Sequence, residues 1–96
     1  MGYIVFVQIT WDPEKADANA EKHGISFEEA ATVLLSETAI RFEDDYPDEE
    51  RFISIGYSSQ ARVLMVVYCY RFEDEIRIIS ARRATKKERE QYEKGI

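Results

Sequence analysis

The chain contains few of the residues from which disulfides, metal sites and membrane anchors are built. Its 96 residues include one cysteine, Cys69, and one histidine, His23, which excludes an internal disulfide and leaves no His/Cys set spaced for zinc. No apolar run approaches the length of a membrane span, and the apolar residues 3–9 have neither a basic flank nor a cleavage site. We therefore expect a cytoplasmic protein with no metal, no cofactor and no membrane contact, in which Cys69 is a buried thiol.

Motifs typical of several common enzyme classes are missing as well. The four glycines form no phosphate-binding loop, and no serine lies in a nucleophile-elbow motif, so P-loop and hydrolase-triad chemistry have no support. Internal repeats, linkers and low-complexity segments are absent too. A chain of this length with 45% hydrophobic and 33% charged side chains is typical of one domain, residues 1–96, with one modest core.

Acidic side chains outnumber basic ones, but unevenly along the chain. The net charge is −6, which for the surface as a whole disfavours binding to a phosphate backbone. Residues 1–50 hold 3 basic and 13 acidic side chains, whereas residues 51–96 hold 10 basic and 6 acidic ones. The second half therefore carries the positive charge that an anion-binding site would need.

The first half predicts a strand followed by two helices. Residues 3–11 are rich in Tyr, Ile, Val and Phe and predict a strand with both faces covered. Asp12 as the N-cap, Pro13 at the first position and Gly24 after the end predict a helix over residues 13–23. Ser26 and Glu29 form the capping-box pattern of a second helix, and the two helices are expected to cover one face of a sheet.

Side-chain spacing assigns the faces of the first helix. The inner face is expected to contain Ala16, Ala20 and His23. The neighbouring polar stripe is expected to contain Lys15, Asn19 and Lys22.

The second half predicts an antiparallel meander and a closing helix. A short strand over 39–42 and an acidic loop over 43–50 precede strands over 51–57, 62–70 and 75–82, which short turns connect. Thr85 and Glu88 form another capping-box pattern, so a helix over 85–94 follows, with Gly95 as its terminator. The predicted fold is α+β: an antiparallel sheet with two N-terminal helices on one face and a C-terminal helix, in the order β-α-α-β-β-β-β-α.

Core residues and clustered cations meet at residues 76–85. A buried-looking strand ends there at Arg82 and Arg83, and a helix begins immediately afterwards at its Thr85 cap. Backbone N–H groups at a helix start and neighbouring guanidinium groups both attract anions, of which phosphate is the commonest. This junction is therefore a candidate phosphate site.

A set of short segments from Trp11 to the C-terminus forms a specific combination. The segments are Trp11-Asp12-Pro13-x-Lys15, Asn19, Lys22-His23-Gly24-Ile25-x-Phe27-x-x-Ala30, Arg51, Gly56, Arg77-Ile78-Ile79-Ser80-Ala81-Arg82 and Arg83-Ala84-Thr85 followed by Glu88, Arg89 and Tyr92. At these spacings they resemble the BrnT toxins. The resemblance implies a RelE-like ribonuclease fold, a type II toxin that inhibits translation, and a BrnA-like ribbon-helix-helix antitoxin that neutralises the toxin. It also implies that operator DNA is bound only through the antitoxin complex.

Arginines are catalytic candidates that are better supported as a group than singly, because metal-free RNA cleavage must stabilise charge on the phosphate. The candidates are Arg51, Arg77, Arg82 and Arg83. On a regular strand Arg77 and Arg83 share one face while Arg82 lies on the other, so the strand alone cannot bring them into one pocket. The alternative is that some of them form surface ion pairs with Glu73, Glu75 or Glu88.

His23 is the sharpest single catalytic candidate. A neutral imidazole near a helix end can accept or donate a proton at neutral pH. The alternative is that His23 lies at the edge of the core and fixes the turn at Gly24.

Five further residues are candidates for RNA binding, each with a structural alternative. They are Trp11, Lys15, Lys22, Tyr68 and Tyr92. Trp11 and Tyr92 could stack on bases or pack in the structure, and Tyr68 could be catalytic or part of the core. The lysines could line a phosphate groove or solvate a helix. A second function class therefore stays open, a non-catalytic module whose basic strand–helix junction docks a partner protein segment.

Overall fold

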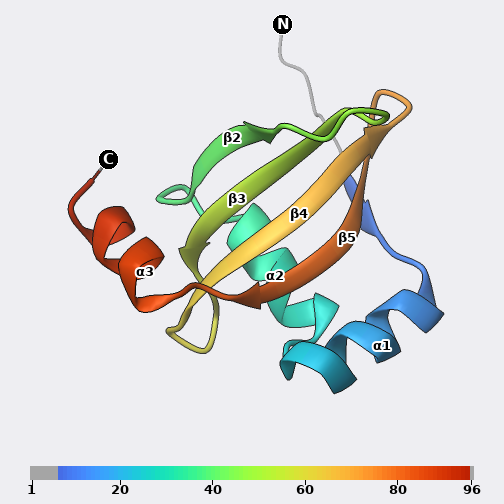
Figure 1. Ribbon diagram of the computed structural model, residues 1–96. Helices are drawn as coiled ribbons and strands as arrows, with labels where there is room; N and C mark the ends of the chain where they lie inside the picture. The colour runs from blue at the N-terminus through green and yellow to red at the C-terminus, as the bar shows by residue number, and fades with distance from the viewer. Residues whose placement is uncertain (1–6, 96) are drawn as a thin grey trace, which may run out of the picture.

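The computed structural model describes residues 7–95, which form an α+β fold with one sheet and three helices (Figure 1). The α+β class is confirmed. In chain order the elements are β1 (Gln8–Thr10), α1 (Pro13–His23), α2 (Phe27–Leu34), β2 (Ile40–Asp44), β3 (Arg51–Tyr57), β4 (Val63–Arg71), β5 (Glu75–Arg83) and α3 (Lys86–Glu93). Residues 3–6 of the predicted first strand lie outside the described residues.

The five strands lie in the order β1-β5-β4-β3-β2. Strands β2 to β5 form the predicted antiparallel meander. The prediction of a wholly antiparallel sheet is wrong, because β1 runs parallel to β5. The first and last strands are neighbours in the fold but distant in the chain, so no local pattern could indicate their relative direction. The α1–α2 pair connects β1 at one edge of the sheet to β2 at the other (Figure 1).

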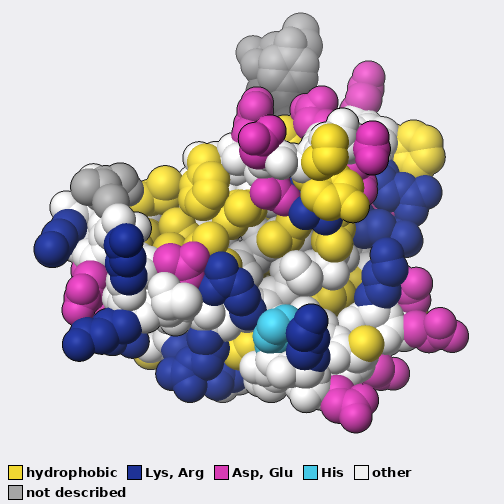
Figure 2. Space-filling model, viewed as in Figure 1, with side chains coloured by type: hydrophobic (Ala, Val, Ile, Leu, Met, Phe, Trp, Pro, Cys, Tyr) yellow, Lys and Arg dark blue, Asp and Glu magenta, His cyan; other side chains and the backbone are white. Residues whose placement is uncertain are grey.

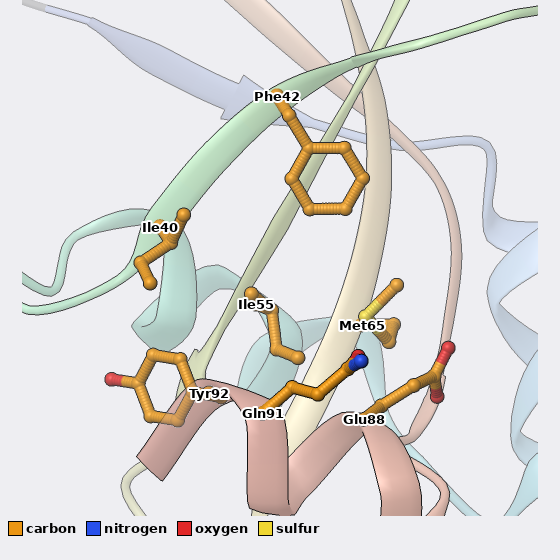
Figure 3. Close-up of a pocket in the computed structure, with 7 residues that line it drawn as sticks. All are labelled: Ile40, Phe42, Ile55, Met65, Glu88, Gln91 and Tyr92. Atoms are coloured by element: carbon orange, nitrogen blue, oxygen red, sulfur yellow. The ribbon is translucent and has the colours of Figure 1, made fainter. Parts of the chain in front are cut away.

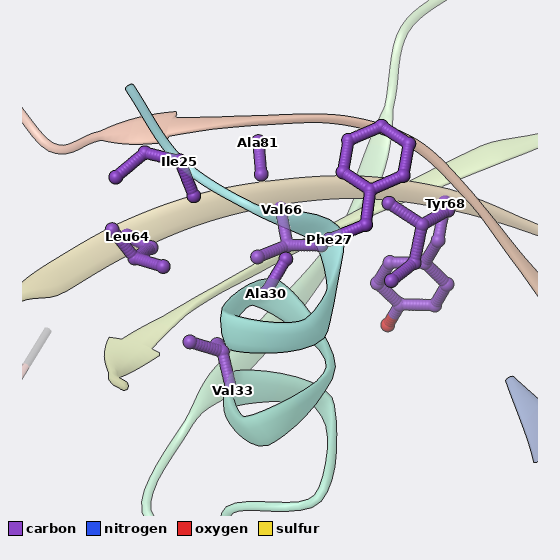
Figure 4. Close-up of a cluster of buried hydrophobic side chains, with 9 residues drawn as sticks. Ile25, Phe27, Ala30, Val33, Leu64, Val66, Tyr68 and Ala81 are labelled. Carbon is purple, nitrogen blue, oxygen red and sulfur yellow. The ribbon is translucent and has the colours of Figure 1, made fainter. Parts of the chain in front are cut away.

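The main core lies between α2 and one face of the sheet, called here the inner face. Phe27, Ala30 and Val33 of α2 are fully buried, and Figure 4 shows them against the strands. The sheet residues of this cluster are Leu64, Val66, Tyr68, Ile78 and Ala81. The alternating pattern of β4 and β5 thus gives one face to this core.

Helix ends follow the predicted caps, with one difference. Asp12 accepts from the Glu14 backbone N–H at 2.9 Å, and Gly24 is left-handed with φ of 71°. Thr85 and Glu88 make both bonds of their capping box. Ser26 accepts from the Glu29 N–H at 3.0 Å, but the carboxylate of Glu29 turns instead to Arg62 and Ser58, so the return bond is not made.

The inner face of α1 differs from the prediction, because Asn19 is buried and Ala20 is exposed. The Asn19 amide donates to the Ala81 carbonyl at 2.8 Å and accepts from the Ala81 N–H at 3.1 Å. It also donates to the Ile25 carbonyl at 3.1 Å. The short β1 pairs only with residues 75–77 of β5, so at Ala81 this side chain takes the place of a neighbouring strand.

The opposite, outer face of the sheet carries a smaller core. Ile55, Val63 and Met65 are buried there, with Tyr92 of α3 packed against them. No helix in residues 7–95 is long and apolar enough to cross a membrane.

Candidate functional site

At the junction of β5 and α3, Arg82 and Arg83 point to opposite faces of the sheet. Arg82 pairs in register with Met65 on the outer face, and Arg83 pairs with Leu64 on the inner face. The predicted site therefore has two sides with different surroundings.

On the outer side, the charge of Arg82 is balanced by Glu88. Two hydrogen bonds of 2.8 and 3.0 Å join the guanidinium to the carboxylate. These bonds, helped by the Thr85 backbone N–H, lower the pKa of Glu88 to about 2. The alternative reading of Arg82 as an ion-pair residue is confirmed, and this arginine holds the start of α3 against β5.

Arg83 shares a pocket at the end of the sheet with two arginines that were not among the predicted catalytic residues. Arg62 from the β3–β4 turn and Arg89 from α3 line the same pocket of about 110 Å³, together with Tyr57 and Val63. Within residues 7–95, no carboxylate lines this pocket. Arg89 stands one helical turn after the Thr85 cap, a spacing that could have identified it, whereas Arg62 arrives from a distant turn.

The carboxylate of Glu29 holds the guanidinium group of Arg62 in place. The guanidinium donates to the two carboxylate oxygens at 2.8 and 2.6 Å, and Ser58 donates at 2.6 Å. The bond from Arg62, opposed by burial and aided by Ser58 and the charge of Arg83, lowers the pKa of Glu29. This one carboxylate balances one of the three cations, and the loose Arg89–Glu93 contact of 3.9 Å adds little, so the pocket keeps excess positive charge.

His23 lies at the same end of the molecule as Arg83. Asn19, one turn before it in α1, binds Ala81, and Ile25, two residues after it, packs in the cluster that contains Leu64, the register partner of Arg83. His23 is half-buried, which fits both the catalytic and the turn-fixing interpretation. Figure 2 shows the histidine in cyan on the viewed face, beside Lys and Arg side chains.

Arg77 does not share a face with Arg83 as predicted, because β5 is not regular. Val67 pairs with Ser80 but Tyr68 pairs with Ile78, so Ile79 is an extra residue that bulges out. The bulge shifts the alternation by one, and Arg77 lies opposite Cys69 on the outer face with Arg82.

Arg51, the first residue of β3, lies on the same outer face and pairs in register with Asp44 of β2. Its guanidinium donates to Asp44 at 2.6 and 3.1 Å and lies 3.8 Å from the Tyr46 ring centroid, so its charge is already balanced. Cys69 itself is half-buried rather than buried, and burial raises its pKa.

The RNA-binding candidates divide between core and surface. Trp11 packs edge-on against Phe27 at 6.0 Å, which confirms its structural alternative. Tyr68 is 1% exposed and belongs to the main core. Lys15 and Lys22 are exposed on α1.

Tyr92 attaches α3 to the sheet and lines a groove. Its hydroxyl donates to the Thr38 carbonyl at 2.9 Å, and its ring packs edge-on against Tyr57. Figure 3 shows the groove, of about 360 Å³, between α3 and the outer face. Its lining is largely apolar and comprises Ile40, Phe42, Ile55, Met65, Glu88, Gln91 and Tyr92.

The end of the sheet where the β2–β3 loop lies is acidic. Figure 2 shows acidic side chains gathered at that end with Lys and Arg side chains beside them, further Lys and Arg side chains around α3, and a second group of acidic side chains at α1. The predicted cations do not meet in one concavity, since Arg82 and Arg51 are paired with carboxylates and Arg83 faces away from both.

Comparisons with known proteins give the family. A family model described as "Ribonuclease toxin, BrnT, of type II toxin-antitoxin system" matches residues 11–88. The 1.1 Å crystal structure of the Brucella abortus ribonuclease toxin BrnT is similar, with a TM-score of 0.68 and 26% sequence identity, covering 83% of this chain and 99% of that one. No curated protein sequence matches. The chain belongs to the BrnT family of ribonuclease toxins of type II toxin–antitoxin systems.

Proposed function

We propose that this toxin cleaves RNA without a metal ion and holds the scissile phosphate in the pocket formed by Arg62, Arg83 and Arg89. The observation that carries the proposal is the convergence of three guanidinium groups on a small pocket that no carboxylate of the described residues lines. Arginine is always charged and binds phosphate bidentately, so these groups can stabilise the extra negative charge of the pentavalent transition state.

Proton transfer completes the chemistry. The 2′-oxygen loses its proton and attacks phosphorus, the bond from phosphorus to the 5′-oxygen breaks, and that oxygen takes up a proton. The products are a 2′,3′-cyclic phosphate and a 5′-hydroxyl. We assign one of the two proton transfers to His23, which lies at the same end of the molecule as Arg83.

The other candidates receive supporting roles in this proposal. Arg82 positions α3 through Glu88, Arg51 holds the β2–β3 loop through Asp44, and Arg77 supplies positive charge on the outer face. Lys15 and Lys22 lie on α1 near His23 and contact the backbone of the RNA strand. The RelE-like fold is part of the same proposal, and translation stops because the cleaved RNA is messenger or ribosome-associated.

Incubation of the purified toxin with RNA in EDTA tests the proposal. We expect cleavage to persist, and Arg83→Gln to lower kcat/KM by about 10²-fold because one donor to the transition state is lost. His23→Asn should lower the rate and change its pH profile. Lys87→Gln, an exposed neighbour on α3, is the matched charge control. Loss of activity in EDTA, or equal activity of the Arg83 and Lys87 variants, would overturn the proposal.

An antitoxin partner follows from the family, and we propose that it is a BrnA-like ribbon-helix-helix protein. The groove of Figure 3 is the apolar surface that it would cover, and the acidic β2–β3 loop at the far end of that face complements a basic DNA-binding partner. In this proposal the toxin contacts operator DNA only through the antitoxin.

The groove also supports the second candidate function, a non-catalytic module that docks a protein segment. Phe42 on its wall is 44% exposed, and the charge of Arg82 beside it is already balanced by Glu88. The two functions separate in one experiment: Phe42→Ser should weaken antitoxin binding and leave RNA cleavage intact. If no preparation cleaves RNA while antitoxin binding is tight, the module is the correct function.

A further inference from the structure

A second polar pocket opens on the inner face, beyond the part of the sheet that α2 covers. Its volume is about 240 Å³ and its polar lining residues are Ser36, Arg41, Ser54 and Tyr68. In the part of the chain that the structure describes, no acidic residue lines it. None of the roles proposed above uses this pocket.

The floor of this pocket is a pair of buried hydroxyl groups, and the hydrogen bond between them leaves one hydroxyl hydrogen free to donate. Ser54 and Tyr68 are 4% and 1% exposed, and their hydroxyl oxygens lie 3.0 Å apart. Two hydroxyl groups carry two hydrogens, but the bond between them uses one. The other hydrogen needs an acceptor, and a buried donor without one costs free energy. The pocket therefore favours a ligand with acceptor oxygens.

Arg41 supplies positive charge at the mouth of the pocket. It pairs in register with Ser54, so its side chain lies on the inner face. No carboxylate oxygen of residues 7–95 lies within 4.0 Å of its guanidinium nitrogens, whereas Arg51, Arg62 and Arg82 each have such a partner. It donates one hydrogen bond, to the Tyr70 hydroxyl at 2.7 Å, which leaves most of its N–H groups available.

Aromatic rings surround this arginine. The guanidinium carbon lies 5.8 Å from the Phe52 centroid and 5.7 Å from the Tyr70 centroid, and Tyr70 is 42% exposed. Phe52 in turn stacks on Tyr68 at 5.9 Å. An exposed aromatic ring beside an arginine is the arrangement by which proteins hold single-stranded nucleic acid, with the base on the ring and the phosphate on the cation.

We propose that the Arg41–Ser54–Tyr68 pocket binds a phosphate group of the RNA substrate away from the scissile bond, with an adjacent base stacked on Tyr70. The inference rests on the proposed ribonuclease function and adds a substrate subsite to it. The pocket lies between the strands that carry Arg41 and Tyr68, whereas the three-arginine pocket lies at the far end of β3 and β4. In an RNA strand that occupies both pockets, several nucleotides must separate the two bound phosphates.

Binding of a 2′-O-methyl oligonucleotide, which cannot be cleaved, tests the subsite by fluorescence anisotropy. We expect Arg41→Gln to weaken binding about tenfold, because a hydrogen bond to a charged group is lost. Ser54→Ala and Tyr68→Phe, which each remove one hydroxyl group, should weaken it about threefold. Arg71→Gln, an exposed arginine on β4 with a loose 4.0 Å ion pair to Glu75, is the control and should have a smaller effect than Arg41→Gln.

Three results would overturn the subsite. Arg41→Gln and Arg71→Gln could bind RNA equally. Arg41→Gln could weaken antitoxin binding alone, which would make the pocket a site for an acidic protein side chain. Inorganic phosphate could bind at Arg41 without competing with the oligonucleotide, which would make it a site for the free ion.

The two proposals fail separately. If Arg83→Gln cleaves RNA normally while Arg41→Gln binds it weakly, the cleavage site is wrong and the subsite stands. If Arg83→Gln is inactive and Arg41→Gln behaves as the wild type, only the subsite is wrong.

Discussion

At the scale of single residues, Asn19 shows how one side chain can complete a sheet. Its amide bonds both backbone groups of Ala81 and one of Ile25 in a buried place. Sequence spacing assigned it to a polar stripe because helical periodicity compares hydrophobicity and cannot recognise a polar side chain whose partners are backbone groups of another strand.

Replacing Asn19 should therefore be costly. Asn19→Ala leaves buried backbone groups without partners and should lower the free energy of unfolding by about 2–4 kcal/mol. Urea unfolding followed by circular dichroism measures this loss. Asp17→Ala, at an exposed position on the same helix, is the control, and a similar small effect of both changes would contradict the role of Asn19.

At Gly56 the backbone of β3 lies so close to Ala39 that a side chain would not fit. A Cβ atom at this position would lie 2.9 Å from the Cβ and 3.1 Å from the Cα of Ala39. Gly56→Ala should lower the free energy of unfolding by about 1–3 kcal/mol, because the two segments must separate. The double variant Gly56→Ala/Ala39→Gly removes the closest contact and should recover part of the loss, whereas additive losses would show that the contact is not the cause.

At the scale of helices and strands, the sequence predicted what local chemistry controls. The caps at Asp12, Ser26 and Thr85 and the left-handed Gly24 all lie where their residue types indicate, because a cap depends on neighbours within four residues. The bulge at Ile79 and the direction of β1 depend on strand pairing, which a single sequence does not reveal.

The candidate site was only partly predictable for the same reason. Arg83 and the junction were found, but the bulge moved Arg77 to the other face, and Arg62 and Arg41 reach their pockets from distant strands and turns. Pairing with Glu88 could be anticipated, since that carboxylate is six residues from Arg82.

The start of α3 should respond to acid. The folded pKa of Glu88 is about 2, below its ordinary 4.5, so its ion pair stabilises the fold above pH 4.5, and this contribution is lost as the pH falls towards 2. Because both side chains are partly exposed, we expect Glu88→Gln to cost about 1–2 kcal/mol at neutral pH.

Unfolding free energies measured between pH 6 and pH 2 check this. The difference between wild type and Glu88→Gln should shrink as the pH decreases. Glu90→Gln, at an exposed position on the same helix, is the matched control. A difference that stays constant over this range would show that the ion pair is not the cause.

At the scale of the whole molecule, an acidic protein is proposed to bind a polyanion through few contacts. The arginines of the cleavage pocket, Lys15 and Lys22, and Arg41 of the subsite should each contribute about −0.7 to the slope in a plot of log K against log salt for single-stranded RNA. Arg83→Gln should reduce this slope by about 0.7, since each phosphate contact contributes that amount. Titrations of the 2′-O-methyl oligonucleotide at several salt concentrations measure both values, and an unchanged slope would place Arg83 outside the contact.

The acidic β2–β3 loop and the three-arginine pocket lie at opposite ends of β3, a strand of seven residues, so about 20 Å separates them. Charges of opposite sign at that distance give the molecule a strong permanent dipole moment despite its net charge of −6. An approaching RNA strand would repel the acidic β2–β3 loop and attract the three-arginine pocket, which would rotate the toxin before any contact forms. Productive encounters would therefore begin at the three-arginine pocket. At high ionic strength the charges are screened, so this preorientation disappears and the toxin meets RNA in random orientations.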